Sequence, residues 1–311
     1  MILSVILMAM YIVEGGFVSI FNGVVVILIV TDQKLRENSE LLFIMGLCIG
    51  DGIDATGYFN AGIVRLSNVL QERDGQTRNA AECFFTSYVT LFFYGYQVAP
   101  LMMLVVSIDR LLAVFAPVWH GSISSFKRLI VMLGVIIWVL IIYCFSCVYV
   151  LLRPNLLATN QCFAAEVYGE TLFAYVIGQR SLLIIVCVLI YIPIFMKTRQ
   201  ILKRKQGNPR IQRFNTTMTL VVFSALFLLA IPDTLAFFNV FGMSNYQIIF
   251  YLIGLNKCIV NIFVYTLRHK ELKNRIKALG KKLFWCLNKH KSSAVAMSTV
   301  TGDGRFSTIR S

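Results

Sequence analysis

Polar and charged side chains recur inside stretches of this chain that are otherwise apolar. A charge at bilayer depth costs about 2.5–3.5 kcal/mol on insertion scales, so each one needs a partner, a water-filled cavity or a functional role. The polar and aromatic residues of interest in these stretches are Asn22, Asp51, Asp54, Asp109, Arg110, Trp138, Lys257, Asn261 and Tyr265. They are therefore the first candidates for function.

The pair Asp109 and Arg110 closes the third apolar stretch. Asp109 is placed to hold the Arg110 guanidinium, which gives a charge that is either kept inward or released toward a cytosolic partner. The alternative is an arginine that snorkels at a helix end, as arginines do in many membrane proteins.

Lys257 lies in the last apolar stretch, and Asp51 falls at a similar depth in the second. Because an unpaired lysine at that depth is costly, we predict an Asp51–Lys257 contact, direct or through Asn22 or Asn261. The alternative is a lysine that faces a water-filled cavity. Together with Asp54, these charges also suit the ion path of a channel or transporter. Against that function, the sequence has no visible inverted repeat of the kind that marks many transporters.

The chain shows no motif of enzyme chemistry. Its three histidines, His120, His269 and His290, fall in predicted cytosolic segments, and no spacing suits a metal ion or an activated nucleophile. We predict a protein without enzymatic activity, cofactor or metal.

The elements that carry the candidate residues are predicted to be membrane-spanning helices. The chain has 311 residues, of which 58% are hydrophobic and 14% charged, and its mean hydropathy is +0.73. Soluble domains are about half apolar and about a quarter charged. Apolar stretches long enough to cross a bilayer cover residues 4–30, 41–66, 84–112, 128–151, 171–196, 215–241 and 246–267. The sequence predicts an all-α bundle of seven spans, with a signal peptide as the alternative for the first stretch.

The basic residues predict the orientation of the spans. They concentrate in alternate connections and the tail, with seven from Lys197 to Arg213 and eleven from Arg268 onward, while the opposite connections hold five. The positive-inside rule then places the N-terminus outside and the C-terminus in the cytosol, which requires an odd number of spans. This placement accounts for the formal net charge of +14 without a nucleic-acid partner.

Two of the eight cysteines, Cys83 and Cys162, fall at predicted extracellular edges. An oxidising exterior favours a disulfide between them, and two free thiols are the alternative. Five others lie within spans and are expected to be buried thiols: Cys48, Cys144, Cys147, Cys187 and Cys258.

Residues 268–285 are predicted to form an amphipathic helix on the anionic inner leaflet, because apolar residues recur there at helical spacing among lysines. Cys286 is either a palmitoylation site or a plain thiol. We expect residues 1–286 to form one domain that includes this helix, and residues 287–311 to form a disordered, Ser/Thr-rich cytoplasmic tail.

Taken in order, these residues resemble those of the rhodopsin-like G-protein-coupled receptors over essentially the whole chain, from residue 10 to about residue 286. Asp109-Arg110-Leu111 matches that family's Asp/Glu-Arg-Tyr element, with leucine in place of tyrosine. Asn261 to Tyr265 matches its Asn-Pro-x-x-Tyr element, with isoleucine in place of proline. Residues of the first, second, fourth and sixth spans that also match are Asn22, Asp51, Trp138 and Pro232.

The departures from that pattern narrow the resemblance. Leu229-Ala230-Ile231 precedes Pro232 where the family usually has Cys-Trp-x, so the usual tryptophan is missing. Gln212 stands near the position of the acidic partner for Arg110, so an ionic lock between the third and sixth spans is not expected. The chain is most similar to nematode serpentine chemoreceptors of the SRSX-like class.

The resemblance implies a chemosensory receptor of the plasma membrane that transmits binding of an extracellular ligand to a heterotrimeric G protein, with arrestin as a further partner. An agonist would swing the sixth span on a kink at Pro232 and expose Arg110. The residues implied in coupling are Asp109, Arg110, Leu111, Pro117 and Tyr191. Those implied in an activation network are Asn22, Asp51, Lys257, Pro232, Asn261 and Tyr265.

The resemblance leaves the ligand open between a small molecule and a peptide. Phe92 stands near the place where amine receptors have aspartate, and Leu255 where an opsin has its lysine, which argues against both classes. Aromatic residues that would line an outer pocket, or else pack in the core, are Phe92, Tyr96, Tyr88, Phe237, Phe238 and Tyr251. Asp233 and Arg180 either contact a polar ligand or are solvated helix ends.

Overall fold

The computed structural model describes residues 2–73, 75–203, 209–238, 247–269 and 271–282. Within those ranges, seven stretches of helix are long and apolar enough to cross a membrane, which confirms the predicted all-α bundle of seven spans. The spans are Ile2–Thr31, Glu40–Leu70, Ser87–Phe115, Ser125–Leu151, Ala164–Gln200, Asn215–Leu235 and Ile248–Thr266. The protein is therefore a multi-pass membrane protein.

Short helices and a small sheet connect the long helices. In chain order the helices are α1 (Ile2–Thr31), α2 (Gln33–Arg36), α3 (Ser39–Leu70), α4 (Ala80–Phe84), α5 (Ser87–Phe115), α6 (Pro117–Gly121), α7 (Ser125–Leu151), α8 (Ala164–Lys203), α9 (Pro209–Ala225), the π-helical η1 (Leu226–Ala230), α10 (Ile231–Phe237) and α11 (Gln247–Arg268). The strands β1 (Thr77–Asn79) and β2 (Leu157–Thr159) pair antiparallel, with Thr77 opposite Thr159.

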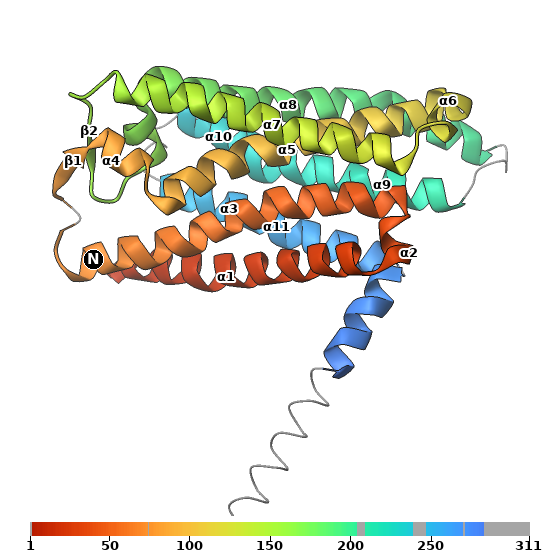
Figure 1. Ribbon diagram of the computed structural model, residues 1–311, viewed down its shortest axis with the longest axis horizontal. Helices are drawn as coiled ribbons and strands as arrows, with labels where there is room; N and C mark the ends of the chain where they lie inside the picture. Colours follow the sequence, from red (N-terminus) through yellow and green to blue (C-terminus); the bar gives the residue numbers. More distant parts are fainter. Residues whose placement is uncertain (1, 74, 204–208, 239–246, 270, 283–311) are drawn as a thin grey trace, which may run out of the picture. The chain divides into compact units, whose positions relative to one another are not determined.

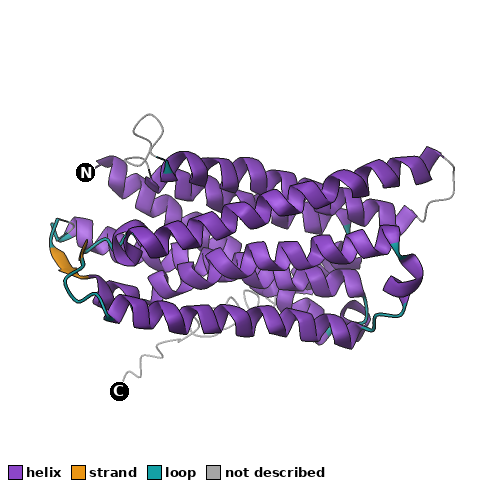
Figure 2. Ribbon diagram, turned by 90° about the horizontal axis from the view of Figure 1, so that it is seen from above, coloured by secondary structure: helices purple, strands orange, loops and turns teal. Residues whose placement is uncertain are grey.

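The long helices run side by side, and their connections collect at two ends of the bundle (Figures 1 and 2). One end, here called the strand end, carries the start of α1, both strands and α4. The other, here called the Arg110 end, carries α2 and α6, and Arg110 lies near the last turn of α5. The two cysteines and the Asp109–Arg110 pair are therefore at opposite ends.

Glycines let α3 approach its neighbours α1 and α5 closely. A Cβ atom built on Gly15 of α1 would lie 2.8 Å from the amide nitrogen of Phe59 in α3. A Cβ atom on Gly95 of α5 would lie 2.6 Å from the Cβ of Asp54 in α3. Larger side chains would separate these helices, so small residues set the helix packing, as is common in membranes.

The helix α7 is the least buried of the spans and presents apolar side chains outward. Trp138 is 51% exposed and Phe145 is 70% exposed. On a membrane-spanning helix such side chains contact lipid rather than water. Trp138 thus lies on the lipid-facing surface, where an indole ring is tolerated, and not among the polar contacts of the core.

The sixth span changes helix type just before Pro232. The helix α9 ends at Ala225, η1 adds one wider π-helical segment, and α10 begins at Ile231. Proline lacks an amide hydrogen and its ring clashes with the preceding turn, so the helix must widen or bend there. The distortion predicted at Pro232 is present as this wide turn.

Two predicted boundaries differ from the structure. The third span was predicted to begin at residue 84, but Cys83 and Phe84 belong to α4, and α5 begins only at Ser87. The fifth span extends back to Ala164 through a kink at Gly169, whose φ of 66° lies in the left-handed region that favours glycine.

The chain divides into two units at Arg268. In the second unit residues 271–282 are helical, with Leu272 buried and Lys277 and Lys281 exposed. This alternation agrees with the predicted amphipathic helix, although Arg268 itself belongs to α11. Cys286 and the tail from residue 287 lie outside the described residues.

Candidate functional site

Asp51 of α3 is held by two residues of α11. Lys257 Nζ lies 2.6 Å from Asp51 Oδ1, and Asn261 Nδ2 lies 2.7 Å from Asp51 Oδ2. Lys257 and Asn261 are one helical turn apart, so both side chains lie on the same face of α11. The predicted Asp51–Lys257 contact is confirmed, and Asn261 completes it.

This cluster is closed to solvent. Asp51 is 1%, Lys257 2% and Asn261 0% exposed. Each carboxylate oxygen of Asp51 accepts a hydrogen bond, and the ammonium group balances its charge, so the pair costs far less than either charge buried alone. The side-chain amide of Asn22 donates to the Val18 carbonyl of its own helix at 3.0 Å. Lys257 is therefore paired rather than turned toward a water-filled cavity.

Asp109 is the centre of a second charge cluster, at the Arg110 end. Its Oδ2 accepts hydrogen bonds from Arg110 Nε, at 3.0 Å, and from Arg110 Nη2. Its Oδ1 lies 3.2 Å from Arg128 Nε and 3.1 Å from His120 Nε2. One carboxylate thus contacts two arginines, and Arg110 is only 2% exposed.

Arg128 and His120 were not predicted from the sequence. Arg128 comes from the first turn of α7 and His120 from α6. Arg128 Nη2 lies 3.0 Å from His120 Nε2, so that nitrogen accepts from Arg128 when the histidine is neutral and donates to Asp109 when it is protonated. The one available signal was a basic residue at the start of an apolar span, which must reach either solvent or a carboxylate.

Two further residues predicted for signalling, Tyr191 of α8 and Tyr265 of α11, are both 1% exposed. Within the described part of the chain, neither hydroxyl has a hydrogen-bond partner. Buried hydroxyls in native proteins are usually satisfied by protein groups or by water. Leu111 is half-buried, and Pro117 begins α6 at the surface.

Nearer the strand end, Arg180 of α8 and Asp233 of α10 form a buried ion pair. Arg180 is 3% and Asp233 8% exposed, so these residues are not solvated helix ends. The Arg180 guanidinium also lies 4.2 Å from the ring centroid of Tyr96, which is a cation–π contact. Three helices, α5, α8 and α10, therefore meet at Arg180.

The aromatic residues predicted for the outer pocket fall into two groups. Tyr88, Phe92, Tyr96 and Tyr251 are buried, and the rings of Phe92 and Tyr96 stack with centroids 5.8 Å apart. Phe237 is 40% exposed and contacts Phe238, which is 70% exposed. The six residues therefore do not line one pocket together, because Phe237 and Phe238 lie outside the buried group.

Buried polar atoms in the same region lack hydrogen-bond partners among the residues that the structure describes. They are Asp54 Oδ1, Gln97 Nε2, Arg180 Nε, Ser181 Oγ and the Tyr251 hydroxyl. Buried polar groups in native proteins are nearly always satisfied by protein, water or ligand. The polar atoms around Arg180 therefore have hydrogen-bonding capacity that the described residues do not use.

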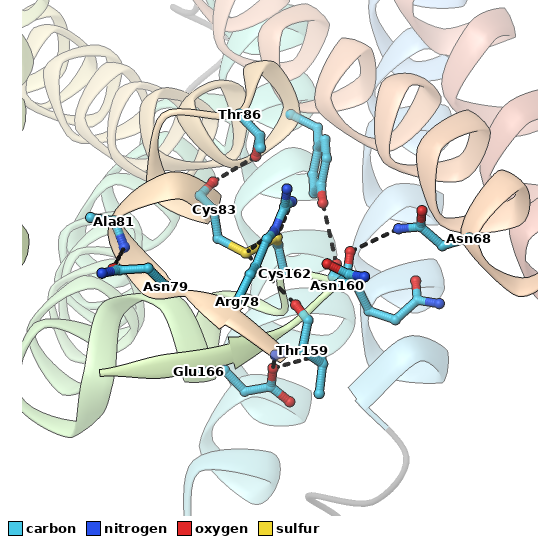
Figure 3. The surroundings of a disulfide bond; sticks show 12 residues. Asn68, Arg78, Asn79, Ala81, Cys83, Thr86, Thr159, Asn160, Cys162 and Glu166 are labelled. Atoms are coloured by element: carbon cyan, nitrogen blue, oxygen red, sulfur yellow. Dashed lines mark hydrogen bonds between the residues drawn. A yellow bond between two sulfur atoms is a disulfide. The ribbon is translucent and has the colours of Figure 1, made fainter. Parts of the chain in front are cut away.

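A disulfide between Cys83 and Cys162 closes the strand end, as predicted (Figure 3). It joins α4 to the segment that follows β2, and Arg78 lies beside it, with Nε 3.0 Å from Cys83 Sγ. The loop after β2 is fixed a second time by Arg65 of α3, which is 0% exposed and donates to the carbonyl oxygens of Gln161 and Cys162. The connection is thus held over the bundle from two sides.

Glu166, at the start of α8, holds β2 in the same connection (Figure 3). Its Oε2 accepts hydrogen bonds from the Thr159 amide, at 2.8 Å, and from the Thr159 hydroxyl, at 2.7 Å. Asn68 of α3 donates to the Asn160 carbonyl at 2.8 Å. These contacts fix the segment that leads into α8, and therefore also the start of the helix that carries Arg180.

A family model matches most of the chain. Its description is serpentine type 7TM GPCR chemoreceptor Srsx, and it covers residues 16–279. The comparison with curated proteins gives no match. In the described ranges, no group of three or more His, Cys, Asp or Glu side chains could hold a metal ion. With seven spans and a match over most of its length, the chain belongs to the Srsx class of serpentine seven-transmembrane chemoreceptors.

Proposed function

We propose that the protein is a chemosensory G-protein-coupled receptor of the plasma membrane, with its N-terminus outside and its C-terminus in the cytosol. The strand end then faces the ligand, and the Arg110 end faces a heterotrimeric G protein, with arrestin as a further partner. The distribution of Lys and Arg supports this orientation, because these residues gather in the connections of the Arg110 end and in the tail.

The observation that carries the proposal is the buried cluster around Asp109. Arg110 is kept inside by a carboxylate that Arg128 also contacts. Because Asp109 and Arg110 both belong to α5, separation of the helices does not itself break their bond; the Arg110 side chain must turn away from Asp109, and its guanidinium can then bond acceptors of a partner protein. The cluster of Asp109, Arg110 and Arg128 is here called the latch, because it keeps Arg110 inside the bundle.

A ligand near Arg180 would act on this latch through the helices that connect the two ends. Arg180 and Asp233 join α8 to α10, and the wide turn η1 lies directly between α10 and α9. A contact that shifts α10 would move α9 about this turn, because π-helical turns interrupt regular helices and are frequent at functional sites. A ligand with higher affinity for the shifted arrangement then changes the populations of the two states.

A reporter assay tests the proposal. Cells that express the receptor and a second-messenger reporter are exposed to a panel of small molecules and peptides, and the Arg110→Ala variant is compared at equal surface amount. Arg110→Ala is expected to abolish the response. Arg36→Ala removes an exposed arginine of α2 at the same end and is expected to retain it. A full response from Arg110→Ala would contradict the proposal.

A channel or transporter that uses Asp51, Asp54 and Lys257 is the other candidate function. The closed Asp51–Lys257 pair favours the receptor, because both oxygens of Asp51 already accept hydrogen bonds and both residues are at most 2% exposed. An ion path needs charges that exchange partners with the passing ion. Current gated by a ligand in membranes without G protein would favour the channel.

A further inference from the structure

A cavity lies on the outside of the bundle at the Arg110 end, distinct from the ligand region near Arg180. Its volume is about 240 Å³, and residues of α3, α5, α6 and α7 line it. Among the lining side chains, Ile108 is 43%, Trp119 58% and Val131 50% exposed. Exposed apolar side chains on membrane spans face acyl chains, so the cavity opens toward lipid.

One side of this cavity carries a net positive charge. Lys127 and Arg128 both line it, and Lys127 is exposed. The only carboxylate in the lining is that of Asp109, which already contacts Arg110 and Arg128. The lining side chains therefore carry two positive charges and one negative charge, which leaves one net positive charge at the cavity.

The start of α7 adds to this attraction for an anion. Ser124 caps the helix by accepting a hydrogen bond from the Lys127 amide at 3.3 Å, so the first turn of a 27-residue helix lies beside the two cations. The N-terminus of a long helix carries a partial positive charge and unpaired amide groups, both of which favour an anion. A cationic edge next to an apolar cavity is complementary to a molecule with an anionic head and an apolar tail.

We propose that this cavity binds an anionic phospholipid of the leaflet at the Arg110 end, with an acyl chain against Ile108 and Val131 and the phosphate against Lys127 and the first turn of α7. The proposal rests on the orientation given above, because the cytosolic leaflet is the one rich in anionic lipids. It does not depend on coupling to a G protein. A phosphate in this position also competes with Asp109 for Arg128, so the bound lipid lies next to the latch.

Fluorescence of Trp119 tests the site directly. The chain has three tryptophans, and Trp138→Phe with Trp285→Phe leaves Trp119 as the only one. The full-length protein is placed in nanodiscs of phosphatidylcholine that contain a small fraction of brominated phosphatidylserine or of brominated phosphatidylcholine. Quenching per brominated lipid is expected to be several-fold stronger for phosphatidylserine. Equal quenching by the two lipids would show an apolar cavity without headgroup preference and would overturn the proposal.

Two substitutions in the same single-tryptophan protein locate the headgroup. Lys127→Gln is expected to bring quenching by brominated phosphatidylserine close to that of the neutral lipid. Lys34→Gln removes another exposed lysine at the same end, in α2, and should leave the preference intact. If Lys127→Gln keeps the preference, or both variants lose it equally, the attraction is a general surface effect and the site is wrong. Thermal unfolding confirms that both variants are folded, and because no agonist or G protein is needed, failure here leaves the receptor proposal standing.

Discussion

Lys257 and Asp51 are 206 positions apart in the chain, yet the lysine nitrogen lies 2.6 Å from a carboxylate oxygen of the aspartate in the core of the bundle. The contact joins the second and seventh spans near the middle of both helices. Asn261 bonds the remaining oxygen. A relative movement of α3 and α11 must break this cluster or carry it along, and we propose that the cluster thereby links the two ends of the receptor.

Lys257→Met is expected to lower the free energy of unfolding by about 3–5 kcal/mol, because it leaves the Asp51 carboxylate buried without its counter-charge. Thermal unfolding of the detergent-solubilised protein measures this loss. Lys197→Met, at an exposed position of α8, is the matched control and should change little. The double variant Asp51→Asn with Lys257→Met should regain most of the stability. A single Lys257→Met variant as stable as the natural protein would show that the pair contributes nothing.

Substitutions of Asp109 and of its partner Arg128 are expected to have different effects on signalling without agonist. Asp109→Asn replaces the charged acceptor of Arg110 by a neutral amide, and a loss of about 1–2 kcal/mol in charged hydrogen bonds should raise basal nucleotide exchange by about 5- to 30-fold. Arg128→Gln removes a competitor for the same carboxylate, so basal exchange should stay equal or fall. Nucleotide exchange, measured on membranes with equal receptor amounts, tests both expectations. A rise with both variants would mean that general loosening of this end, and not the hold on Arg110, sets basal activity.

Helix packing by glycine predicts a position-specific cost. Gly95→Ala places a Cβ atom 2.6 Å from Asp54 Cβ and 2.7 Å from Asp54 Cα, so backbone must move, with an expected loss of about 1–3 kcal/mol. Gly134→Ala, on α7, meets no atom within 4 Å and should be neutral or stabilising. Unfolding temperatures of the two variants test this difference. Equal temperatures would show that α3 and α5 do not need the close approach.

The Arg180–Asp233 pair either stabilises the fold alone or also binds the ligand, and two variants distinguish these roles. Arg180→Gln alone should destabilise the fold by about 3–5 kcal/mol, because it strands the Asp233 carboxylate. The double variant Arg180→Gln with Asp233→Asn should fold close to normally. If the pair contacts the ligand, as proposed, this folded double variant should still lose most of its agonist response. A normal dose–response curve would assign the pair to packing alone.

Sequence reasoning located the Asp51–Lys257 contact because few opposite charges exist at that depth of an apolar helix. The same reasoning gave Arg180 and Asp233 two possible roles and did not pair them. Both lie in the outer halves of predicted spans, and the periodicity of the sequence does not fix how deep in the membrane each residue lies. Their burial depends on the packing of α8 against α10, which is a tertiary contact that the sequence pattern does not show.

The Asp109 cluster was only half visible in the sequence. Asp109 and Arg110 are neighbours in the chain, so their contact follows from local geometry. His120 and Arg128 reach Asp109 only because α6 turns the chain back before α7 begins, and a five-residue helix leaves no periodicity to detect. The separation of α4 from α5 was missed for a similar reason, because the apolar pattern continues through the break at Phe85 and Thr86.

Nucleotide exchange on a purified heterotrimeric G protein tests the central claim most directly. The receptor is reconstituted in nanodiscs, an agonist from the reporter screen is added at the strand-end side, and natural and Arg110→Ala proteins are compared at equal folded amounts. Agonist should accelerate exchange by the natural receptor, and Arg110→Ala should show no acceleration while still binding the agonist. If Arg110→Ala accelerates exchange as well as the natural receptor does, the buried arginine is not the signalling element and the account is wrong.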